Sequence, residues 1–372
     1  MIEAAERVAL VAERELEALV GVSTPSGDVA GAEEAVALCI AFLPPEARPE
    51  RIDCSTPGHA QDLVGRLSGS GERRLLLVGH LDTVVAHDAH RPLERDRDRL
   101  VGSGAVDMKG GVALALGVMR DLAGRPQLYS EAAVLLVNDE EWRTVPFGHT
   151  ERFSGFDACL CFEAGEVDAD GNDALIVKRK AAGTLHVEAH GRPAHSGSAP
   201  QKGRSALLAL ADVAQRIAAR SDPDGPDRLT AVPTILRSGE AFNVVPPHGE
   251  LICDLRADAL DAFRPVLDGV PAAVGDVAIE SKLVRAWPGM DTRAATADVL
   301  EDASVRLGRP LVASERGGAS DASHIATALP LTIDGLGPRG GGAHAPQEWV
   351  GAASLRTRAE VALALVAAIL RA

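Results

Sequence analysis

The fold is decided by the stretch LLLVGHLDTV, which runs from Leu75 to Val84. Its first five residues are apolar or small, a pattern typical of a strand buried on both faces of a parallel sheet. The run leads directly into His80-Leu81-Asp82. Side chains two positions apart lie on the same side of an extended chain. Since open α/β sheets bind ligands at the carboxyl ends of their strands, His80 and Asp82 are candidate site residues.

This stretch has two interpretations. A neutral imidazole is a good Zn²⁺ ligand, and a carboxylate next to it can fix its tautomer. The alternative is a satisfied polar pair at a strand end with no metal. The rest of the chain favours the metal.

Composition limits the classes of function. The chain has 372 residues, which predicts two or three domains, and its net charge of −15 argues against a nucleic-acid partner. No apolar run approaches the roughly 18 residues of a membrane span, and the start is typical of an acidic amphipathic helix, not of a signal peptide. The five cysteines are scattered, which favours buried free thiols and a cytoplasmic location.

Strand and helix patterns alternate along most of the chain. Buried strands are expected at 75–79, 132–138, 157–162 and 330–334, and helices at 1–21, 31–43, 112–123, 295–307 and 349–371. This alternation predicts an α/β fold with a mostly parallel sheet flanked by helices.

The pattern changes between residues 178 and 288. Segments 184–190 and 250–256 alternate with period two, and 204–220 has helical spacing. We therefore expect an inserted α+β domain at 178–288, with an antiparallel sheet and helices on one face. The first domain is then discontinuous and consists of 1–177 and 289–372.

Further candidate ligands follow expected strands or lie in Gly-rich loops of the first domain. They are Asp107, Glu140 with Glu141, Glu163 and His344. Each has an ordinary alternative: Asp107 as a helix cap, the paired glutamates as a solvated turn, Glu163 as a cap or ion-pair partner, and His344 as a loop histidine. Their coincidence at positions that one α/β sheet gathers together favours a metal centre.

The donor set suits two divalent ions. Zn²⁺ accepts imidazole nitrogen and carboxylate oxygen, and two ions a few ångströms apart can share a carboxylate. One carboxylate must stay off the metals to take a proton from the attacking water. Adjacent Glu140 and Glu141 offer this division, with one as ligand and the other as base.

Six motifs in order resemble the M20 metallopeptidases, the di-zinc group of carboxypeptidases, aminoacylases and acyl-amino-acid deacylases. The motifs are GHLDTV (79–84), DMKGG (107–111), DEE (139–141), FEA (162–164), GRPAHSG (191–197) and GAHA (342–345). The glutamate carboxypeptidase branch is the most similar. The resemblance extends from about residue 5 to the end of the chain.

The resemblance implies roles for the residues of the first domain. The zinc ligands would be His80, Asp107, Glu141, Glu163 and His344, with Asp107 bridging the two ions. Asp82 would orient His80, Glu140 would be the general base, and the peptide bond after Asp107 would be cis. Co²⁺ is an alternative metal.

It also implies roles for the inserted domain, which would be a lid and the interface of a homodimer. His195 would reach the partner subunit's site and polarise the scissile carbonyl. The free carboxylate of the substrate would bind Arg256, Asn243 and Ser320. From the residues alone, His195 is an exposed loop histidine and Arg256 a possible surface ion pair.

The chain departs from the family pattern after its paired glutamates. Trp142-Arg143-Thr144 stands where relatives have a small apolar residue, then Gly and Ser or Thr. We expect a di-zinc hydrolase that cleaves an amide next to a free carboxylate, of the glutamate carboxypeptidase type. The alternative enzyme is an N-acyl amino acid deacylase of the aminoacylase or acetylornithine type. A non-catalytic binding module and a structural protein assembled through the lid are the rivals outside catalysis.

Overall fold

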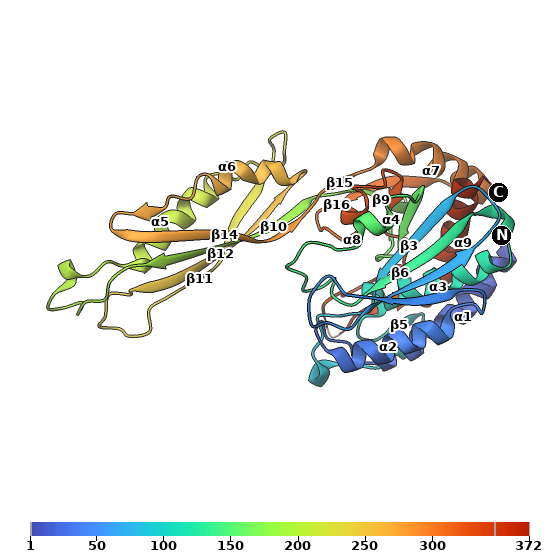
Figure 1. Ribbon diagram of the computed structural model, residues 1–372, viewed down its shortest axis with the longest axis horizontal. Helices are drawn as coiled ribbons and strands as arrows, with labels where there is room; N and C mark the ends of the chain where they lie inside the picture. The colour runs from blue at the N-terminus through green and yellow to red at the C-terminus, as the bar shows by residue number, and fades with distance from the viewer. Residues whose placement is uncertain (1, 346, 372) are drawn as a thin grey trace. The chain divides into compact units, whose positions relative to one another are not determined.

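The computed structural model describes residues 2–345 and 347–371 and divides into two compact units (Figure 1). One unit combines the residues up to Lys178 with Asp291–Arg316 and the residues from Ser320 onward. The other combines Arg179–Met290 with Gly317–Ala319. None of the described helices is both long and apolar enough to cross a membrane.

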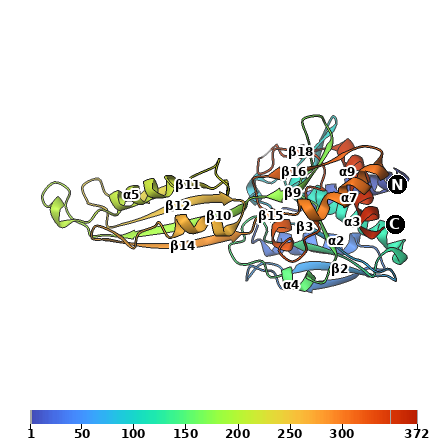
Figure 2. The ribbon, with the colours of Figure 1, turned by 90° about the horizontal axis from the view of Figure 1, so that it is seen from above.

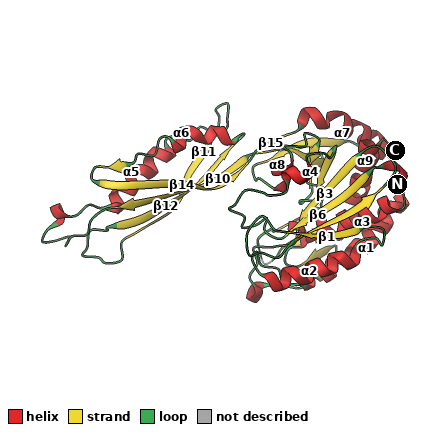
Figure 3. Cartoon of the chain, in the orientation of Figure 1, coloured by secondary structure: helices red, strands yellow, loops and turns green. Residues whose placement is uncertain are grey.

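A six-stranded sheet forms the centre of the first unit. Figure 3 shows strands of this unit in yellow with helices around them. Its order is β1 (Arg48–Ile52), β2 (Asp62–Ser68), β6 (Glu131–Val137), β3 (Arg74–His80), β7 (Ala158–Cys161) and β17 (Thr332–Ile333). Strands β6, β3, β7 and β17 are parallel, while β1 and β2 add an antiparallel edge. The predicted α/β fold with a mostly parallel sheet is therefore confirmed.

Helices bury the sheet. They are α1 (Ile2–Gly21), α2 (Val29–Phe42), α3 (Gly110–Ala123), α4 (Thr150–Phe153), α7 (Arg293–Leu307), α8 (Asp321–Ile325) and α9 (Ala352–Leu370). Helix α3 packs on β3 and β6, with α1 and α9 beside it, and α8 contacts β3, β7 and β17. Leu75 and Leu77 of β3 belong to the core that contains α1, α3 and α9. Leu76 and Val78, which alternate with them, are also fully buried. The continuous apolar run thus reflects a strand covered on both faces.

The strand register brings the site loops to one edge. His80 pairs with Val137 of β6, and Val78 pairs with Cys161 of β7. The parallel strands β6, β3 and β7 therefore end together, and the loops that follow them begin at the same edge of the sheet.

A smaller sheet places part of the C-terminal segment next to the loop that contains Asp107. It contains β4 (Glu94–Asp96), β5 (Arg99–Val101), β18 (Gly340–Gly341) and β19 (Trp349–Gly351). Pairing of β19 with β5, together with the hydrogen bond of 2.9 Å from the Gly102 amide to the Glu348 backbone oxygen, holds Glu348 beside the 102–107 loop. The remaining strands of this part of the chain are β8 (Glu166–Val167), β9 (Asp173–Arg179), β15 (Met290–Asp291) and β16 (Leu311–Arg316).

The second unit is a five-stranded antiparallel sheet, visible from another direction in Figure 2. Its order is β11 (Thr230–Ser238), β12 (His248–Ala257), β10 (Ala181–His190), β14 (Val277–Trp287) and β13 (Ala273–Val274). Helices α5 (Ala206–Ala218) and α6 (Arg264–Leu267) contribute residues to its core. Leu185, Val187 and Ala189 of β10 face that core, so the alternate residues of β10 lie on the open face of the sheet.

Candidate metal centre

His80 is the last residue of β3 and is almost fully buried. Its Nδ1 lies 3.0 Å from the backbone oxygen of Asp82 and 3.4 Å from Asp82 Oδ1. With a proton on Nδ1, Nε2 is left as the metal-binding atom. That atom lies 3.1 Å from Oδ1 of Asp107.

Asp107 directs one carboxylate oxygen toward each of two histidines. Its Oδ1 faces His80, and its Oδ2 lies 3.1 Å from Nε2 of His344. Helix α3 begins with Lys109 at its N-cap, so Asp107 does not cap it. The peptide bond between Asp107 and Met108 is cis.

Two glutamates complete two groups of ligand atoms. Glu163 Oε1 lies 3.9 Å from His80 Nε2, and Glu141 Oε2 lies 3.2 Å from His344 Nε2. The groups are His80–Asp107–Glu163 and Asp107–Glu141–His344, and within each the ligand atoms lie within 4.8 Å of one another. This spacing suits ions bound about 2.0–2.2 Å from nitrogen and oxygen. The donor set therefore fits two divalent metals that share Asp107.

Asp82 connects His80 to the loop that follows β6 and contains Glu140 and Glu141. Its Oδ1 accepts a hydrogen bond of 3.1 Å from the Glu140 amide, and its Oδ2 accepts one of 3.1 Å from the Glu141 amide. The sequence predicted that Asp82 orients His80. The structure adds that both of its oxygens hold the backbone of the paired glutamates.

Glu140 belongs to neither ligand group, although it is largely buried. Burial and the carboxylates of Glu163, Asp321 and Glu141 hold its pKa well above the usual range, against the opposing effect of His80. A carboxylate that readily accepts a proton suits a general base.

Glu348 is a site residue that the sequence analysis missed. Its Oε1 accepts hydrogen bonds from the amides of Val106 and Asp107, at 2.7 and 2.8 Å. Its Oε2 accepts one of 2.9 Å from Gly104. Burial raises the pKa of Glu348 to about 7. A glutamate four residues after His344 gives no local signal of this contact, which depends on the pairing of β19 with β5.

Trp142 and Arg143, where the sequence departs from the M20 pattern, lie in opposite environments. Trp142 is 65% exposed, whereas Arg143 is fully buried. Arg143 donates to one oxygen of Asp321, at 2.7 Å from Nη1 and 2.5 Å from Nη2, and its Nε lies 3.3 Å from Asp139 Oδ1. Asp139 Oδ2 accepts from the amide and hydroxyl of Thr56. Arg143 thus joins the turn that contains the paired glutamates to α8.

His195 and Asn243 lie together in the second unit. His195 is exposed, and its Nδ1 accepts from the amides of Gly197 and Ser198, at 3.1 and 3.2 Å. In the neutral ring the proton therefore resides on Nε2. The amide of Ser196 donates to the backbone oxygen of Asn243, which joins the two segments.

The remaining predicted substrate residues have partners. Arg256 lies on the open face of β12 and forms an ion pair with Asp254, with Nη2 at 3.0 Å from Asp254 Oδ1. Ser320 is buried in the first unit and donates a hydrogen bond of 2.6 Å to Asp334. The structure thus brings the predicted metal ligands, Asp82 and Glu140 together in the first unit, while His195, Asn243 and Arg256 belong to the second.

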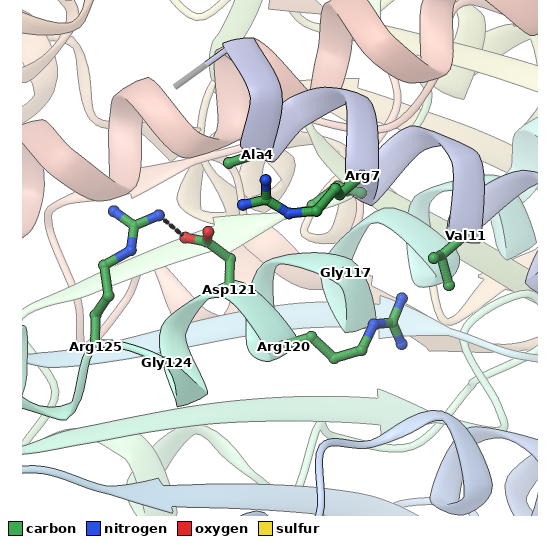
Figure 4. Close-up of a pocket in the computed structure, with 9 residues that line it drawn as sticks. Ala4, Arg7, Val11, Gly117, Arg120, Asp121, Gly124 and Arg125 are labelled. Atoms are coloured by element: carbon green, nitrogen blue, oxygen red, sulfur yellow. Dashed lines mark hydrogen bonds and ion pairs between the residues drawn. The ribbon is translucent and has the colours of Figure 1, made fainter.

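A separate pocket lies between α1 and α3 (Figure 4). Arg7, Arg120, Asp121 and Arg125 line it, and Arg125 binds Asp121. Arg120 donates to Glu15 and to the backbone oxygen of Phe42. None of the candidate ligands lines this pocket.

Comparison with known proteins gives one consistent family. The sequence model of peptidase family M20/M25/M40 matches residues 76–368. Carboxypeptidase G2 from Pseudomonas sp. strain RS-16 is 26% identical over 373 residues, which covers 94% of this chain and 87% of that protein. Succinyl-diaminopimelate desuccinylase from Methylorubrum populi is 28% identical over 315 residues, with 78% and 80% covered.

The fold has matches among solved structures. The M20 family metallo-carboxypeptidase Sso-CP2 from Sulfolobus solfataricus superposes with a TM-score of 0.75 over 97% of this chain and 99% of that one. At 15% identity, this likeness concerns the fold alone.

Proposed function

The chain belongs to peptidase family M20/M25/M40 and is a hydrolase of the metallopeptidase and amidohydrolase class, and on this premise we propose that it cleaves an amide bond next to a free carboxylate, as a carboxypeptidase of the glutamate carboxypeptidase type. One observation supports the proposal most strongly: Asp107 directs its two oxygens to His80 and to His344. A carboxylate directed at two imidazole groups can be shared by a pair of divalent ions.

The proposed ligands would hold two Zn²⁺ or Co²⁺ ions. His80, Asp107 and Glu163 form one group, and Asp107, Glu141 and His344 form the other. When bound, the ions would lower the pKa of a water molecule and polarise the substrate carbonyl. Imidazole and carboxylate donors favour Zn²⁺ and its neighbours over Mg²⁺.

Glu140 is the proposed general base. It would take a proton from the attacking water and deliver it to the leaving nitrogen, which breaks the amide bond and releases an amine. The Asp82 hydrogen bond to its amide supports this role, because it fixes the start of the Glu140 side chain beside His80.

His195 is proposed to polarise the scissile carbonyl in the active site of a partner subunit. The acceptor role of its Nδ1 supports this, since it leaves Nε2–H as the donor. Arg256, Asn243 and Ser320 are the proposed ligands of the substrate carboxylate. For Arg256 this requires competition with Asp254, and for Ser320 it requires the hydroxyl to turn from Asp334.

The second unit is proposed to be the lid and the surface of a homodimer. Exposed apolar side chains on α5 and the edge strand β11 support this role. They are Leu207, Leu208, Val232, Ile235 and Leu236. The five unpaired cysteines, four of them buried, support a cytoplasmic location.

A second candidate function is that of an N-acyl amino acid deacylase, favoured by the similarity to a desuccinylase. Both reactions use the same metals and base and differ in the acyl group accepted. The free carboxylate next to the amide is common to both.

The test measures amine release from C-terminal dipeptides, folyl-type glutamates and N-acyl amino acids by the Zn²⁺-loaded protein. We expect turnover that a chelator abolishes, and a loss of about 10²–10⁴-fold in Glu140→Gln at unchanged metal content. Glu151→Gln, an exposed residue of α4, is the matched control and keeps full activity. Full activity in Glu140→Gln would reject the mechanism, and the preferred substrate decides between carboxypeptidase and deacylase.

Mixing two inactive variants tests the partner role of His195. His195→Ala and Glu140→Gln are inactive alone, but a mixed dimer contains one site with both groups. Random exchange of subunits recovers about one quarter of wild-type activity if His195 acts in the partner's site. No recovery from mixed dimers, or a monomer in sedimentation at high concentration, would contradict this role.

A further inference from the structure

A second group of potential metal ligands lies in the inserted unit. It consists of Glu188 and His190 on β10 and Glu280 on β14, whose ligand atoms lie within 4.8 Å of one another. His190 Nε2 lies 3.6 Å from Glu188 Oε2 and 3.9 Å from Glu280 Oε1. All three side chains stand on the open face of the sheet, away from the core.

The strand register places like charges directly opposite one another. Glu188 of β10 pairs with Glu250 of β12 on one side and with Glu280 of β14 on the other. Like charges directly opposite across strands are destabilising. Arg237 compensates Glu250 through an ion pair of 2.7 Å. Glu188 and Glu280 have the imidazole of His190 between them.

We propose that Glu188, His190 and Glu280 bind a divalent transition-metal ion on the face of this sheet. A doubly charged cation relieves the repulsion between the two glutamates more fully than a single protonated histidine. The observed separations are typical of donor atoms that share one ion about 2.0–2.2 Å away.

His186 lies beside the site and orients it. Its Nδ1 faces Glu188 Oε1 at 3.7 Å, and its Nε2 faces Glu250 Oε2 at 3.2 Å. Both of its nitrogens are thus directed at carboxylates, so His186 supports Glu188 from outside the ligand group. Oε1 of Glu188 faces His186 while Oε2 faces His190, which leaves Oε2 for the ion.

The donors indicate which ions fit. One imidazole with two carboxylates favours Zn²⁺, Ni²⁺ or Cu²⁺ over Mg²⁺ and Ca²⁺, which prefer oxygen alone. His190 and Glu188 are about half exposed and Glu280 is 77% exposed, so water supplies the remaining coordination positions. A bound ion links β10 to β14 and stabilises the inserted unit by its binding free energy. The inference does not depend on the proposed catalytic function.

The test counts metal ions. The purified protein is dialysed against micromolar Zn²⁺, and zinc per chain is measured by mass spectrometry for the wild type, His190→Ala, Glu280→Gln and the exposed control Glu240→Gln. We expect the wild type and Glu240→Gln to bind one more ion per chain than the other two variants. Circular dichroism checks that each variant is folded.

A spectroscopic readout identifies the ligand. Cu²⁺ added after zinc saturation of the tighter sites should give an electron paramagnetic resonance spectrum with nitrogen coupling, which His190→Ala removes. Equal zinc content in all four proteins would overturn the proposal, because His190 alone would then balance the two glutamates. A Cu²⁺ spectrum unchanged in folded His190→Ala would also overturn it.

Discussion

The backbone amide of Asp107 donates a hydrogen bond of 2.8 Å to Oε1 of Glu348, a residue 241 positions later in the chain. The same carboxylate accepts from the amides of Gly104 and Val106. The loop that contains Asp107 is therefore held by a side chain from the C-terminal segment. The position of Asp107 depends on this buried carboxylate.

Glu348→Ala should impair the metal centre without removing a ligand. Three buried amides lose their acceptor, and an unsatisfied buried group costs about 1–3 kcal/mol. We expect metal affinity and activity to fall about 10–100-fold, as when a group that orients a ligand is lost. Glu348→Gln keeps one acceptor oxygen and should fall less. Zinc titration with a competing chelator measures the change, and exposed Glu17→Gln is the control. Wild-type affinity in Glu348→Ala would contradict the role.

Asp82→Asn should test whether the Asp82 carboxylate holds the Glu140 and Glu141 backbone, because the variant keeps the size of the side chain but removes its charge. An amide group keeps one acceptor but presents a donor to the amide of Glu140 or of Glu141, so one hydrogen bond is lost. We expect kcat to fall at least tenfold while the two ions of the metal centre stay bound at saturating zinc. Steady-state kinetics and metal analysis measure both, beside exposed Asp88→Asn. Unchanged kcat would show that the amides are held without Asp82.

Removal of single ligands should change the metal count unequally. Asp107 belongs to both ligand groups, whereas His344 belongs to one. In the metal centre, His344→Ala should therefore retain one ion and Asp107→Ala none, while the site at Glu188, His190 and Glu280 is unaffected in both. Chelation should lower the melting temperature of the wild type, and zinc should restore it, because the ions bind the folded state. Equal metal content in the two variants would contradict a shared Asp107.

The buried pair of Arg143 and Asp321 should show strong coupling. Removing one partner leaves an uncompensated buried charge, which costs about 3–5 kcal/mol. We expect Arg143→Met and Asp321→Asn each to destabilise the fold, and the double variant to lose less than the sum of the two. The free energy of unfolding in urea measures the cycle, with exposed Arg14→Met as the control. Additive losses would reject the coupling.

Glu131 should contribute stability that is lost in acid. Burial raises its pKa, but hydrogen bonds from Arg74 and Arg66, on the strands that flank β6, outweigh burial and lower the pKa below its ordinary value. The folded pKa is thus below the unfolded value of about 4.3. The contribution is complete above the unfolded pKa and disappears as pH falls through the folded pKa.

The measurement compares unfolding free energies of wild type and Glu131→Gln from pH 7 to pH 3. We expect the wild type to be more stable at pH 7 and the difference to shrink below about pH 4.3. A difference independent of pH would show that the ion pairs do not set the pKa.

Local sequence patterns were sufficient for the central sheet and for the expectation that the candidate ligands lie close together. The apolar run at 75–79 is a buried strand, and the polar residues that follow β3 and β7 converge because parallel strands end together. The spacing of polar residues after each strand is a short-range property, so it can be read from adjacent positions.

Contacts between distant segments could not be predicted in this way. Glu348 meets Asp107 through the pairing of β19 with β5, and Arg143 meets Asp321 across 178 positions. Neither residue lies in a pattern that distinguishes it from a solvated charge. Ser320 illustrates the same limit, because only the folded chain reveals Asp334 as the partner of its hydroxyl.

The order of the ligands along the chain has a consequence for how the protein can vary. All three members of the group His80–Asp107–Glu163 precede the inserted segment in the sequence. In the group Asp107–Glu141–His344, His344 follows the inserted segment. Neither group takes a ligand from the insertion. The two ligand groups therefore place no requirement on the length or surface of the insertion beyond its two ends, where it joins the first unit. A change in the insertion can therefore leave both groups of candidate ligands intact.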